Sequence, residues 1–197
     1  MSAPEGPAEA NAGSGVQIAD CPADIVEIAA LRGGAPALHE VASRRAAPLP
    51  PRGRVGLLAG GLILSVRPER WLVLSPPAAP GAVAQSWAAA CAGCGVALEL
   101  SSALTALHVS GAAVREVLKR GCRLDLEPPG FPAGSAAATI IVQVPVVMAA
   151  LASGVLLLTP SSTARHFREW LAAAARPFGL MPYAGVTVAF LSEKGMT

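Results

Sequence analysis

Short hydrophobic runs alternate along the chain with turn residues and with amphipathic segments of helical spacing. Residues 55–92 contain three hydrophobic runs, separated by Gly60-Gly61 and by Arg67-Pro-Glu-Arg70, and an amphipathic segment follows them. In that segment Val83 and Trp87 are four residues apart, which places them on one face of a helix. The pattern predicts a β-β-β-α unit.

A second copy of this unit is predicted over residues 139–176, and it begins 84 residues after the first. Val144-Pro145 and Ser153-Gly154 are expected to separate its three strands, and Phe167 and Leu171 repeat the helical spacing. Any hairpin followed by an amphipathic helix gives a similar pattern, and this explanation stays open beside a true duplication.

A strand and a short helix are predicted between the two copies. Residues 104–109 alternate between two faces, as in a strand, and an amphipathic segment follows. Ser110 is expected to cap that helix at its start, and Gly121 to end it with a positive φ. In the same way, a hydroxyl group among residues 161–163 is expected to cap the helix of the second copy.

Together these elements predict an α+β fold, with duplicated β-β-β-α units around the central strand-helix segment. One compact domain of two similar halves is expected over residues 21–192. Residues 1–20 are rich in Ala, Gly, Pro, Ser and Glu and are expected to form a flexible N-terminal tail. Residues 193–197 are expected to form a short C-terminal tail.

Charge is scarce and nearly balanced along the chain. The 197 residues include 15 Lys and Arg against 13 Asp and Glu, a formal net charge of +2 without basic runs, which argues against a nucleic-acid partner. Only 14% of the residues are charged, whereas soluble domains usually have about 25%. This deficit favours a surface partly covered by another chain.

The start of the sequence does not resemble a signal peptide, and four cysteines are too few for a disulfide-built fold, so a cytoplasmic protein is expected.

One uncharged run, residues 136–158, is long enough to span a membrane. Gln143, Pro145 and Ser153-Gly154 interrupt it, and neither flank has a cluster of Lys or Arg. The run therefore favours three strands over a membrane helix, and no membrane partner is expected.

Candidate chemistry is sparse. Cys91 and Cys94 have the spacing of a metal knuckle or a redox dithiol, but no second pair completes a zinc site, and a preceding helix end disfavours a thiolate. His39, His108 and His166 are scattered along the sequence. Neither a phosphate-binding loop nor a Gly-x-Ser-x-Gly elbow is present. We therefore assign no catalytic, cofactor-binding or metal-binding residue to this chain.

The tryptophans are the largest hydrophobic side chains, and Trp71, Trp87 and Trp170 have the periodicity of core positions. Trp71 also lies close in sequence to Arg67 and Arg70, and aromatic and arginine side chains are enriched at protein interfaces. Arg67, Arg70 and Trp71 are therefore the candidate interface residues.

Three segments resemble the gamma subunit of heterotetrameric sarcosine oxidase. They are residues 100–135 (LSSALTALHVSGAAVREVLKRGCRLDLEPPGFPAGS), 65–74 (SVRPERWLVL) and 155–171 (VLLLTPSSTARHFREWL). The most specific part is the Val109-Ser-Gly111 step, followed by Gly121-Cys-x-Leu-Asp125-Leu and Phe131-Pro. The resemblance covers residues 20–180, and the same order is similar to the first part of the aminomethyltransferase, or glycine-cleavage T-protein, fold.

The resemblance implies a subunit of a four-chain flavoenzyme that oxidatively demethylates sarcosine to glycine. In that family the alpha chain holds NAD and a folate-binding region, the beta chain holds FAD and covalent FMN, and the delta chain holds zinc. The gamma chain carries no known catalytic residue. The implied partners are therefore alpha, beta and delta chains, the implied role is to assemble with and stabilise the flavin-bearing chains, and tetrahydrofolate is used by the complex.

Two alternatives stay open. A subunit of a related N-methylglutamate dehydrogenase would share the architecture and oxidise a different amine. A freestanding folate-binding protein of the aminomethyltransferase type would need carboxylates and an arginine that converge on a pterin, for which the sequence offers Asp125, Glu99 and Arg123.

Overall fold

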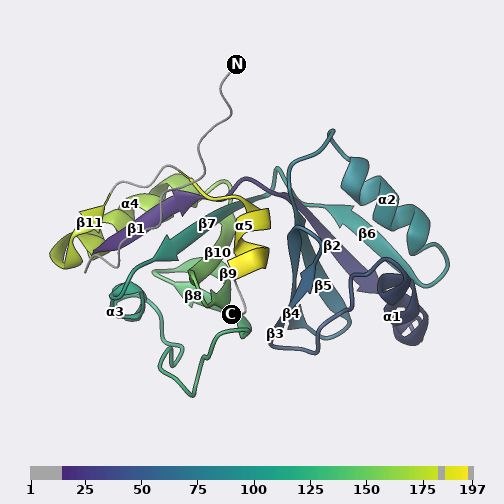
Figure 1. Cartoon of the computed structure of the whole chain (residues 1–197), viewed down its shortest axis with the longest axis horizontal. Coiled ribbons are helices and arrows are strands. Elements are labelled where there is room, and N and C mark those ends of the chain that lie inside the picture. The colour runs from purple at the N-terminus through teal and green to yellow at the C-terminus, as the bar shows by residue number, and fades with distance from the viewer. Residues whose placement is uncertain (1–14, 182–184, 195–197) are drawn as a thin grey trace.

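The computed structural model of the chain describes residues 15–181 and 185–194. Within these residues two β-sheets face each other, and helices cover the outer face of each sheet (Figure 1). The layers are helix, sheet, sheet and helix. The fold class is confirmed as α+β.

One sheet, here called sheet B, has five antiparallel strands. Helices α1 (Ala35–Arg44) and α2 (Ala82–Ala90) lie on its outer side. The strands in spatial order are β3 (Arg54–Leu58), β4 (Gly61–Arg67), β5 (Arg70–Ser75), β2 (Asp24–Ala30) and β6 (Gly95–Glu99).

The other sheet, sheet A, has six strands, of which only the β1–β11 pair is parallel. Helices α3 (Val114–Lys119) and α4 (Ala164–Ala175) cover its outer side, and the short 3₁₀ helix η1 (Arg176–Phe178) follows α4. The strands in order are β11 (Leu180–Met181), β1 (Val16–Asp20), β7 (Leu104–Ser110), β10 (Gly154–Pro160), β9 (Val144–Leu151) and β8 (Ala136–Ile141).

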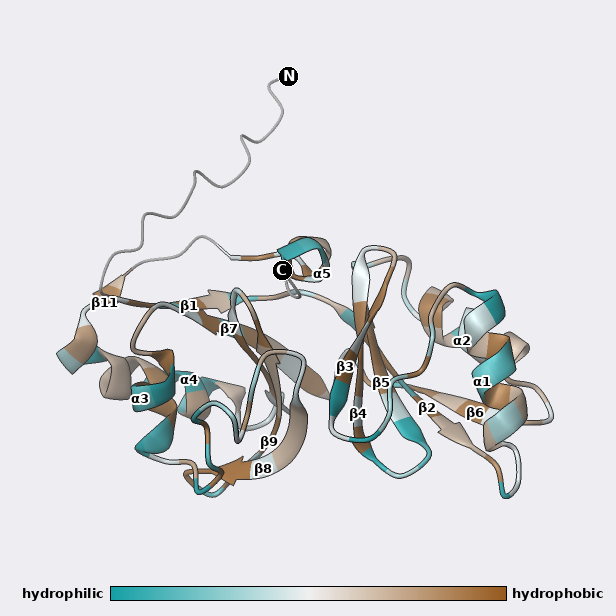
Figure 2. Cartoon of the chain, turned by 60° about the horizontal axis from the view of Figure 1, so that its bottom comes forward, coloured by the Kyte–Doolittle hydropathy of each residue, from teal (hydrophilic) through white to brown (hydrophobic). Residues whose placement is uncertain are grey.

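The layers bury three hydrophobic cores, because alternate residues of each strand point to opposite faces. Phe167 belongs to the core between sheet A and its helices, and Trp87 to the core between sheet B and its helices. The middle core joins the inner faces of the two sheets, including Leu64 and Leu158, and Leu191 of helix α5 (Val188–Lys194) completes it. Hydrophobic residues are accordingly concentrated in the strands, and polar residues on the helices and at the strand ends (Figure 2).

Both predicted β-β-β-α copies are present, as β3-β4-β5-α2 and β8-β9-β10-α4. The repeat is longer than predicted, because a strand and a helix precede each copy: β2-α1 in the first half and β7-α3 in the second. The spatial order β3-β4-β5-β2 matches β8-β9-β10-β7. The central strand-helix segment is thus the start of the second unit.

The predicted tail boundaries are wrong by a few residues at each end. Residues Val16–Asp20, assigned to a tail over 1–20, form strand β1, which pairs with both β7 and β11. Val16 is fully buried, and this tertiary burial outweighs a local composition typical of disorder. Helix α5 continues to Lys194, two residues past the predicted end of the domain at 192. Residues 1–14 and 195–197 lie outside the described residues.

The turn between the first two strands of the second copy lies two residues before its predicted place. Val142 and Gln143 form it, with φ angles of 47° and 65°, and Val144-Pro145 already belongs to β9. Pro145 is tolerated there because it lies beyond the part of β9 that pairs with β10. The uncharged run 136–158 forms strands, as predicted, and the described residues contain no helix long and apolar enough to cross a membrane.

The predicted helix caps are wrong. Helix α3 begins at Val114, too far from Ser110 for capping, and helix α4 has no side-chain cap, because the Thr163 hydroxyl donates to the Pro160 carbonyl instead. Gly121 does not have a positive φ. It is needed for space, because a Cβ atom there would lie 2.7 Å from Cζ2 of Trp170.

Candidate functional site

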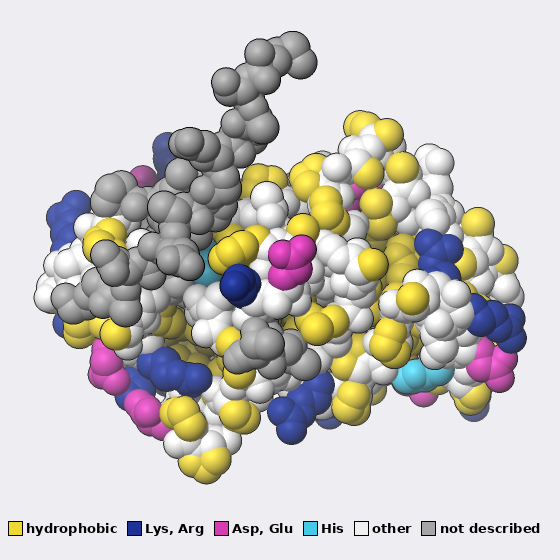
Figure 3. All heavy atoms as spheres, in the orientation of Figure 1, with side chains coloured by type: hydrophobic (Ala, Val, Ile, Leu, Met, Phe, Trp, Pro, Cys, Tyr) yellow, Lys and Arg dark blue, Asp and Glu magenta, His cyan; other side chains and the backbone are white. Residues whose placement is uncertain are grey.

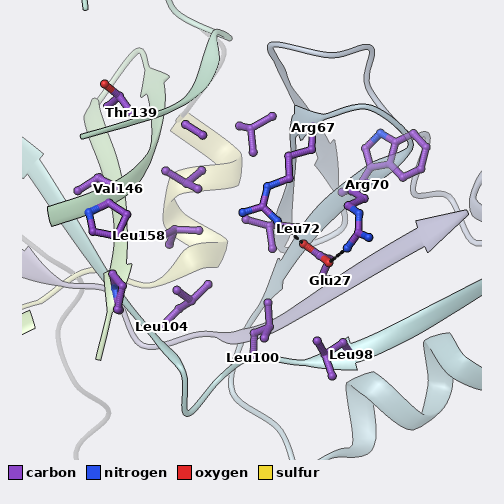
Figure 4. A pocket seen from close by; sticks show the side chains of 16 residues that line it. Glu27, Arg67, Arg70, Leu72, Leu98, Leu100, Leu104, Thr139, Val146 and Leu158 are labelled. Carbon is purple, nitrogen blue, oxygen red and sulfur yellow. Dashed lines mark hydrogen bonds and ion pairs between the residues drawn. The ribbon is translucent and has the colours of Figure 1, made fainter. Parts of the chain in front are cut away.

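A groove with a volume of about 420 Å³ lies between the two sheets, where their inner faces are not fully covered by each other (Figure 4). Its walls are mostly apolar, and among the described residues that line it the charged groups all come from sheet B. The lining includes Glu27, Arg67, Arg70, Leu72, Leu98 and Leu100 on one side, and Leu104, Thr139, Pro145, Val146, Leu158 and Pro160 on the other.

Strand register explains why charged and apolar groups meet in this groove. Glu27 of β2 pairs with Leu72 of β5 on one side and with Leu98 of β6 on the other, so the three side chains share the inner face of sheet B. Leu72 belongs to the middle core, whereas Leu98 is 57% exposed. The inner face of sheet B therefore continues beyond the area that sheet A covers.

Two arginines share one carboxylate on this uncovered face. Nη1 of Arg70 lies 2.7 Å from Oε1 of Glu27, and Nη1 of Arg67 lies 3.9 Å from its Oε2. The Glu27 side chain is only 14% exposed, while at least half of each arginine side chain is accessible. One negative and two positive charges leave a local net charge of +1 at the groove, available to an anionic group.

Of the three predicted interface residues, Trp71 is placed differently from its neighbours. Its side chain is 4% exposed and packs in the core beneath the helices of sheet B. The indole Nε1 donates to the carbonyl of Pro50 at 2.9 Å, and the ring meets His39 edge to face. Trp71 borders the groove but holds the sheet to its helices. Of the three predicted interface residues, only Arg67 and Arg70 offer accessible polar groups to a ligand or partner.

Glu27 is the site residue that sequence reasoning missed. A signal for it exists, because Glu27 is the only charged residue between Ile25 and Ala30, in a segment that is otherwise apolar. A charge at such a position in a strand indicates either an exposed edge or a buried partner. Here the partners are Arg67 and Arg70, which are distant in sequence.

The cysteines are buried free thiols. Cys91 lies just after α2, and the Sγ–H of Cys94 donates to its carbonyl at 3.4 Å. Burial and the neighbouring Cys94 raise the pKa of the Cys91 thiol, although Arg45 opposes them. Burial also raises the pKa of Cys21 to about 12. These conditions favour inert thiols that fill the core.

The remaining candidates are not brought together. His108 lies in the middle of sheet A, where burial lowers its pKa to about 4, and its Nε2 is 3.4 Å from Oγ of Ser153. Asp125, Glu99 and Arg123 do not border the groove. Residues 15–181 and 185–194 contain no group of three or more His, Cys, Asp or Glu side chains placed to hold a metal ion.

The comparisons with known proteins agree with this architecture. Residues 49–176 match the model of the sarcosine oxidase, gamma subunit family. Over 136 residues the chain is 30% identical to sarcosine oxidase subunit gamma of Corynebacterium sp. strain P-1, an alignment that spans 66% of each chain.

Two solved structures are similar in fold. One is a chain of the heterotetrameric sarcosine oxidase from Corynebacterium sp. U-96 in complex with pyrrole 2-carboxylate, with a TM-score of 0.73 and 23% identity over 86% of this chain and 88% of that one. The other is the glycine cleavage system aminomethyltransferase T from Bartonella henselae, with a TM-score of 0.58 and 15% identity over 85% of this chain and 47% of that one. The expected likeness to the aminomethyltransferase fold is confirmed.

Proposed function

Since the chain belongs to the sarcosine oxidase gamma subunit family, we propose that it is a non-catalytic subunit of a heterotetrameric, flavin-dependent sarcosine oxidase. Such a complex demethylates sarcosine oxidatively to glycine. The observation that carries the proposal is the family match over residues 49–176, which includes β3-β4-β5-α2 and the whole of β7-α3-β8-β9-β10-α4. The role of this chain is to assemble with the alpha, beta and delta chains and to stabilise the flavin-bearing ones.

The surface supports an assembly role. Charged residues make up 14% of the chain, and on the face shown in Figure 3 hydrophobic side chains are exposed over wide areas between scattered charges. A groove with apolar walls and two accessible arginines adds a surface on which another chain can dock. Apolar area interrupted by arginine is typical of protein interfaces.

The chemistry of the buried polar groups supports a non-catalytic role. A general base works best with a pKa near the operating pH and with access to substrate, whereas His108 is buried with a pKa of about 4. A nucleophilic thiol needs a lowered pKa, whereas burial raises the pKa of Cys21 and Cys91.

In the proposed complex the other chains bind FAD, FMN, NAD and zinc, and they also use tetrahydrofolate. The proposed location of the assembly is the cytoplasm.

The test is to produce the alpha, beta and delta chains with and without this one. We expect that leaving it out reduces assembly of the complex, its flavin content per beta chain and its turnover of sarcosine. Size-exclusion chromatography, flavin absorbance and peroxide release measure the three quantities. Unchanged values in the three-chain preparation would refute the proposed role.

Two further measurements separate the alternatives. Turnover of sarcosine and of N-methylglutamate by the complete complex are compared, and a preference for N-methylglutamate would replace sarcosine as the proposed substrate. Isothermal titration of the isolated chain with tetrahydrofolate is expected to show no binding, since Asp125, Glu99 and Arg123 do not converge on the groove. Micromolar binding would favour a freestanding folate protein instead.

A further inference from the structure

Strand β6 is an edge of sheet B without the usual protection against pairing with another chain. Among the described residues its only strand partner is β2. Edge strands are normally protected by lysine, proline, inward-pointing charges or a bulge. Residues 95–98, Gly-Val-Ala-Leu, contain none of these side chains, and their pairing with β2 runs without a bulge. The one charged side chain of the strand is at its end, where the Glu99 carboxylate accepts from the N–H of Ser101. This edge is open to the addition of a strand.

The side chains beside this edge are apolar and exposed. Val96 is 52% and Leu98 is 57% exposed, and they share the face of the sheet that bears Ala29 and Glu27. Leu98 also lines the groove, next to Leu100. The two exposed side chains therefore extend the apolar wall of the groove out to the free edge, and such a continuous surface is typical of one that another protein covers.

The backbone at this edge is also available. The N–H of Leu100 donates to the carbonyl of Ile25 at 2.7 Å, which fixes the residues of β6 that bond to β2. In an antiparallel ladder these alternate, so Leu98 and Val96 bond inward, while the N–H groups of Ala97 and Glu99 point to the free edge. A strand added here would find two donors in regular spacing.

Charge indicates the chemistry of the added strand. Arg67 and Arg70 share the single carboxylate of Glu27, so the uncovered face has a net charge of +1. A second copy of this chain would bring the same two arginines and would repel. A different chain with an Asp or Glu side chain complements them.

We propose that β6 accepts an extended segment of another chain, which pairs along the free edge, lays apolar side chains on Val96 and Leu98, and places a carboxylate at Arg67 and Arg70. Strand addition of this kind draws affinity from main-chain hydrogen bonds and specificity from alternate side chains. The inference rests on the proposed function, because the segment belongs to the alpha, beta or delta chain of the oxidase.

The test compares variants of this chain in co-expression with the alpha, beta and delta chains. Leu98→Asp is expected to lower incorporation into the complex about tenfold, as central apolar contacts of interfaces commonly do. Its matched control is Leu180→Asp, an equivalent change at an exposed leucine on the edge of sheet A, which should stay within about twofold of the native chain. Arg70→Glu should likewise reduce incorporation, whereas Arg44→Glu on the exposed face of α1 should not.

Thermal unfolding of each free variant shows whether it folds.

A second experiment, cross-linking, does not depend on variants that weaken the interface. A photo-cross-linking amino acid replaces Leu98, and the cross-linked peptide is identified in the assembled complex. A peptide of alpha, beta or delta with alternating apolar residues and a carboxylate supports the proposal. A cross-link to a second copy of this chain, or none, overturns it.

The outcomes also separate this inference from the proposed function. If the native chain assembles and Leu98→Asp assembles equally well, strand addition at β6 is wrong while the subunit role stands. If the native chain itself fails to join the other three, the proposed function is wrong, and this inference is overturned with it.

Discussion

Glu27 is the residue on which the charge of the groove depends. Its carboxylate lies between Arg67 and Arg70, and only a small part of it is exposed. Because one carboxylate serves two guanidinium groups, its removal leaves both arginines without their acidic partner on the same face. Exposed pairs contribute little to stability, but a mostly buried carboxylate with two partners contributes more.

Glu27→Gln is therefore expected to lower the free energy of unfolding by about 1 kcal/mol, since the amide cannot replace either ion pair. Urea unfolding at pH 7 measures the change. Glu40→Gln is the matched control, because Glu40 forms an exposed pair with Arg44, and its loss should cost less than about 0.5 kcal/mol. Equal effects of the two variants would contradict a special role for Glu27.

His108 makes stability depend on pH in a defined window. Burial lowers its pKa from 6.5 to about 4, so between these values the unfolded chain binds a proton that the folded chain does not. This proton favours the unfolded chain, so the free energy of unfolding decreases as the pH falls from 6.5 toward 4. Above pH 6.5 His108 is neutral in both states, and this loss is absent. Between pH 7 and pH 4.5 the native chain should lose about 2 to 3 kcal/mol more than the His108→Gln variant, by urea unfolding. Parallel pH profiles of the two proteins would show that His108 is accessible.

The sequence identified residues of the candidate site only where neighbours in the chain determine the surroundings of the side chain. Arg67 and Arg70 flank a two-residue turn, which places both on one exposed rim, so their candidacy followed from local pattern. Glu27 was missed because its partners come from strands 40 or more residues away. The burial of Trp71 was not evident from the sequence, because its hydrogen-bond acceptor, the carbonyl of Pro50, is likewise not a local group.

At the scale of elements, the β8–β9 hairpin contains an unusual turn. Val142 and Gln143 both have positive φ angles, which glycine and asparagine adopt at lower cost than other residues. Val142 also packs against the core of sheet A, whereas Gln143 is exposed.

Gln143→Gly is therefore expected to raise the free energy of unfolding by about 0.5 to 1 kcal/mol, because it relieves backbone strain without removing a packed side chain. Chemical unfolding of the free chain measures it. Gln85→Gly makes the same change on the exposed side of α2, where glycine should instead cost about 1 kcal/mol. A loss of stability in Gln143→Gly would show that the turn is not strained.

The hairpins and the helices that follow them were predicted well, because each depends on turn residues and periodicity within a single segment. Strand β1 was not predicted, since it has five residues in a region rich in small ones and becomes a strand only by pairing with β7 and β11. The β8–β9 turn was misplaced because Pro145 was interpreted as a break between strands. In the sheet Pro145 pairs with β8 but lies outside the part of β9 that pairs with β10, so a proline is tolerated there.

At the scale of the whole molecule, the middle core couples the two halves, and helix α5 completes it. Leu191 is fully buried among residues from both sheets. Leu191→Ala should lower the free energy of unfolding by about 2 to 4 kcal/mol and keep a single transition, because both halves lose the same core. Calorimetry measures this, with Leu31→Ala, at a half-exposed leucine, as the control. Two separate transitions would show that the halves fold independently.

The groove is a property of this scale and could not be predicted from the sequence. It exists because the inner face of sheet B extends past the area that sheet A covers, and that offset follows from how the two halves pack. Periodicity identifies which residues of each strand share a face, but it does not determine how much of that face a second sheet covers.

The positions of the strands of sheet A along the chain affect when this sheet can form during synthesis. Its strand β1 comes from the first described residues and pairs with β11, which forms near the end of the chain. Sheet B, by contrast, is built entirely from residues 24–99. During synthesis the residues of sheet B therefore leave the ribosome before sheet A is complete, because the second neighbour of β1, strand β11, lies more than 160 residues downstream of it. A product that ends before residue 180 would lack β11 and leave that edge of β1 unpaired.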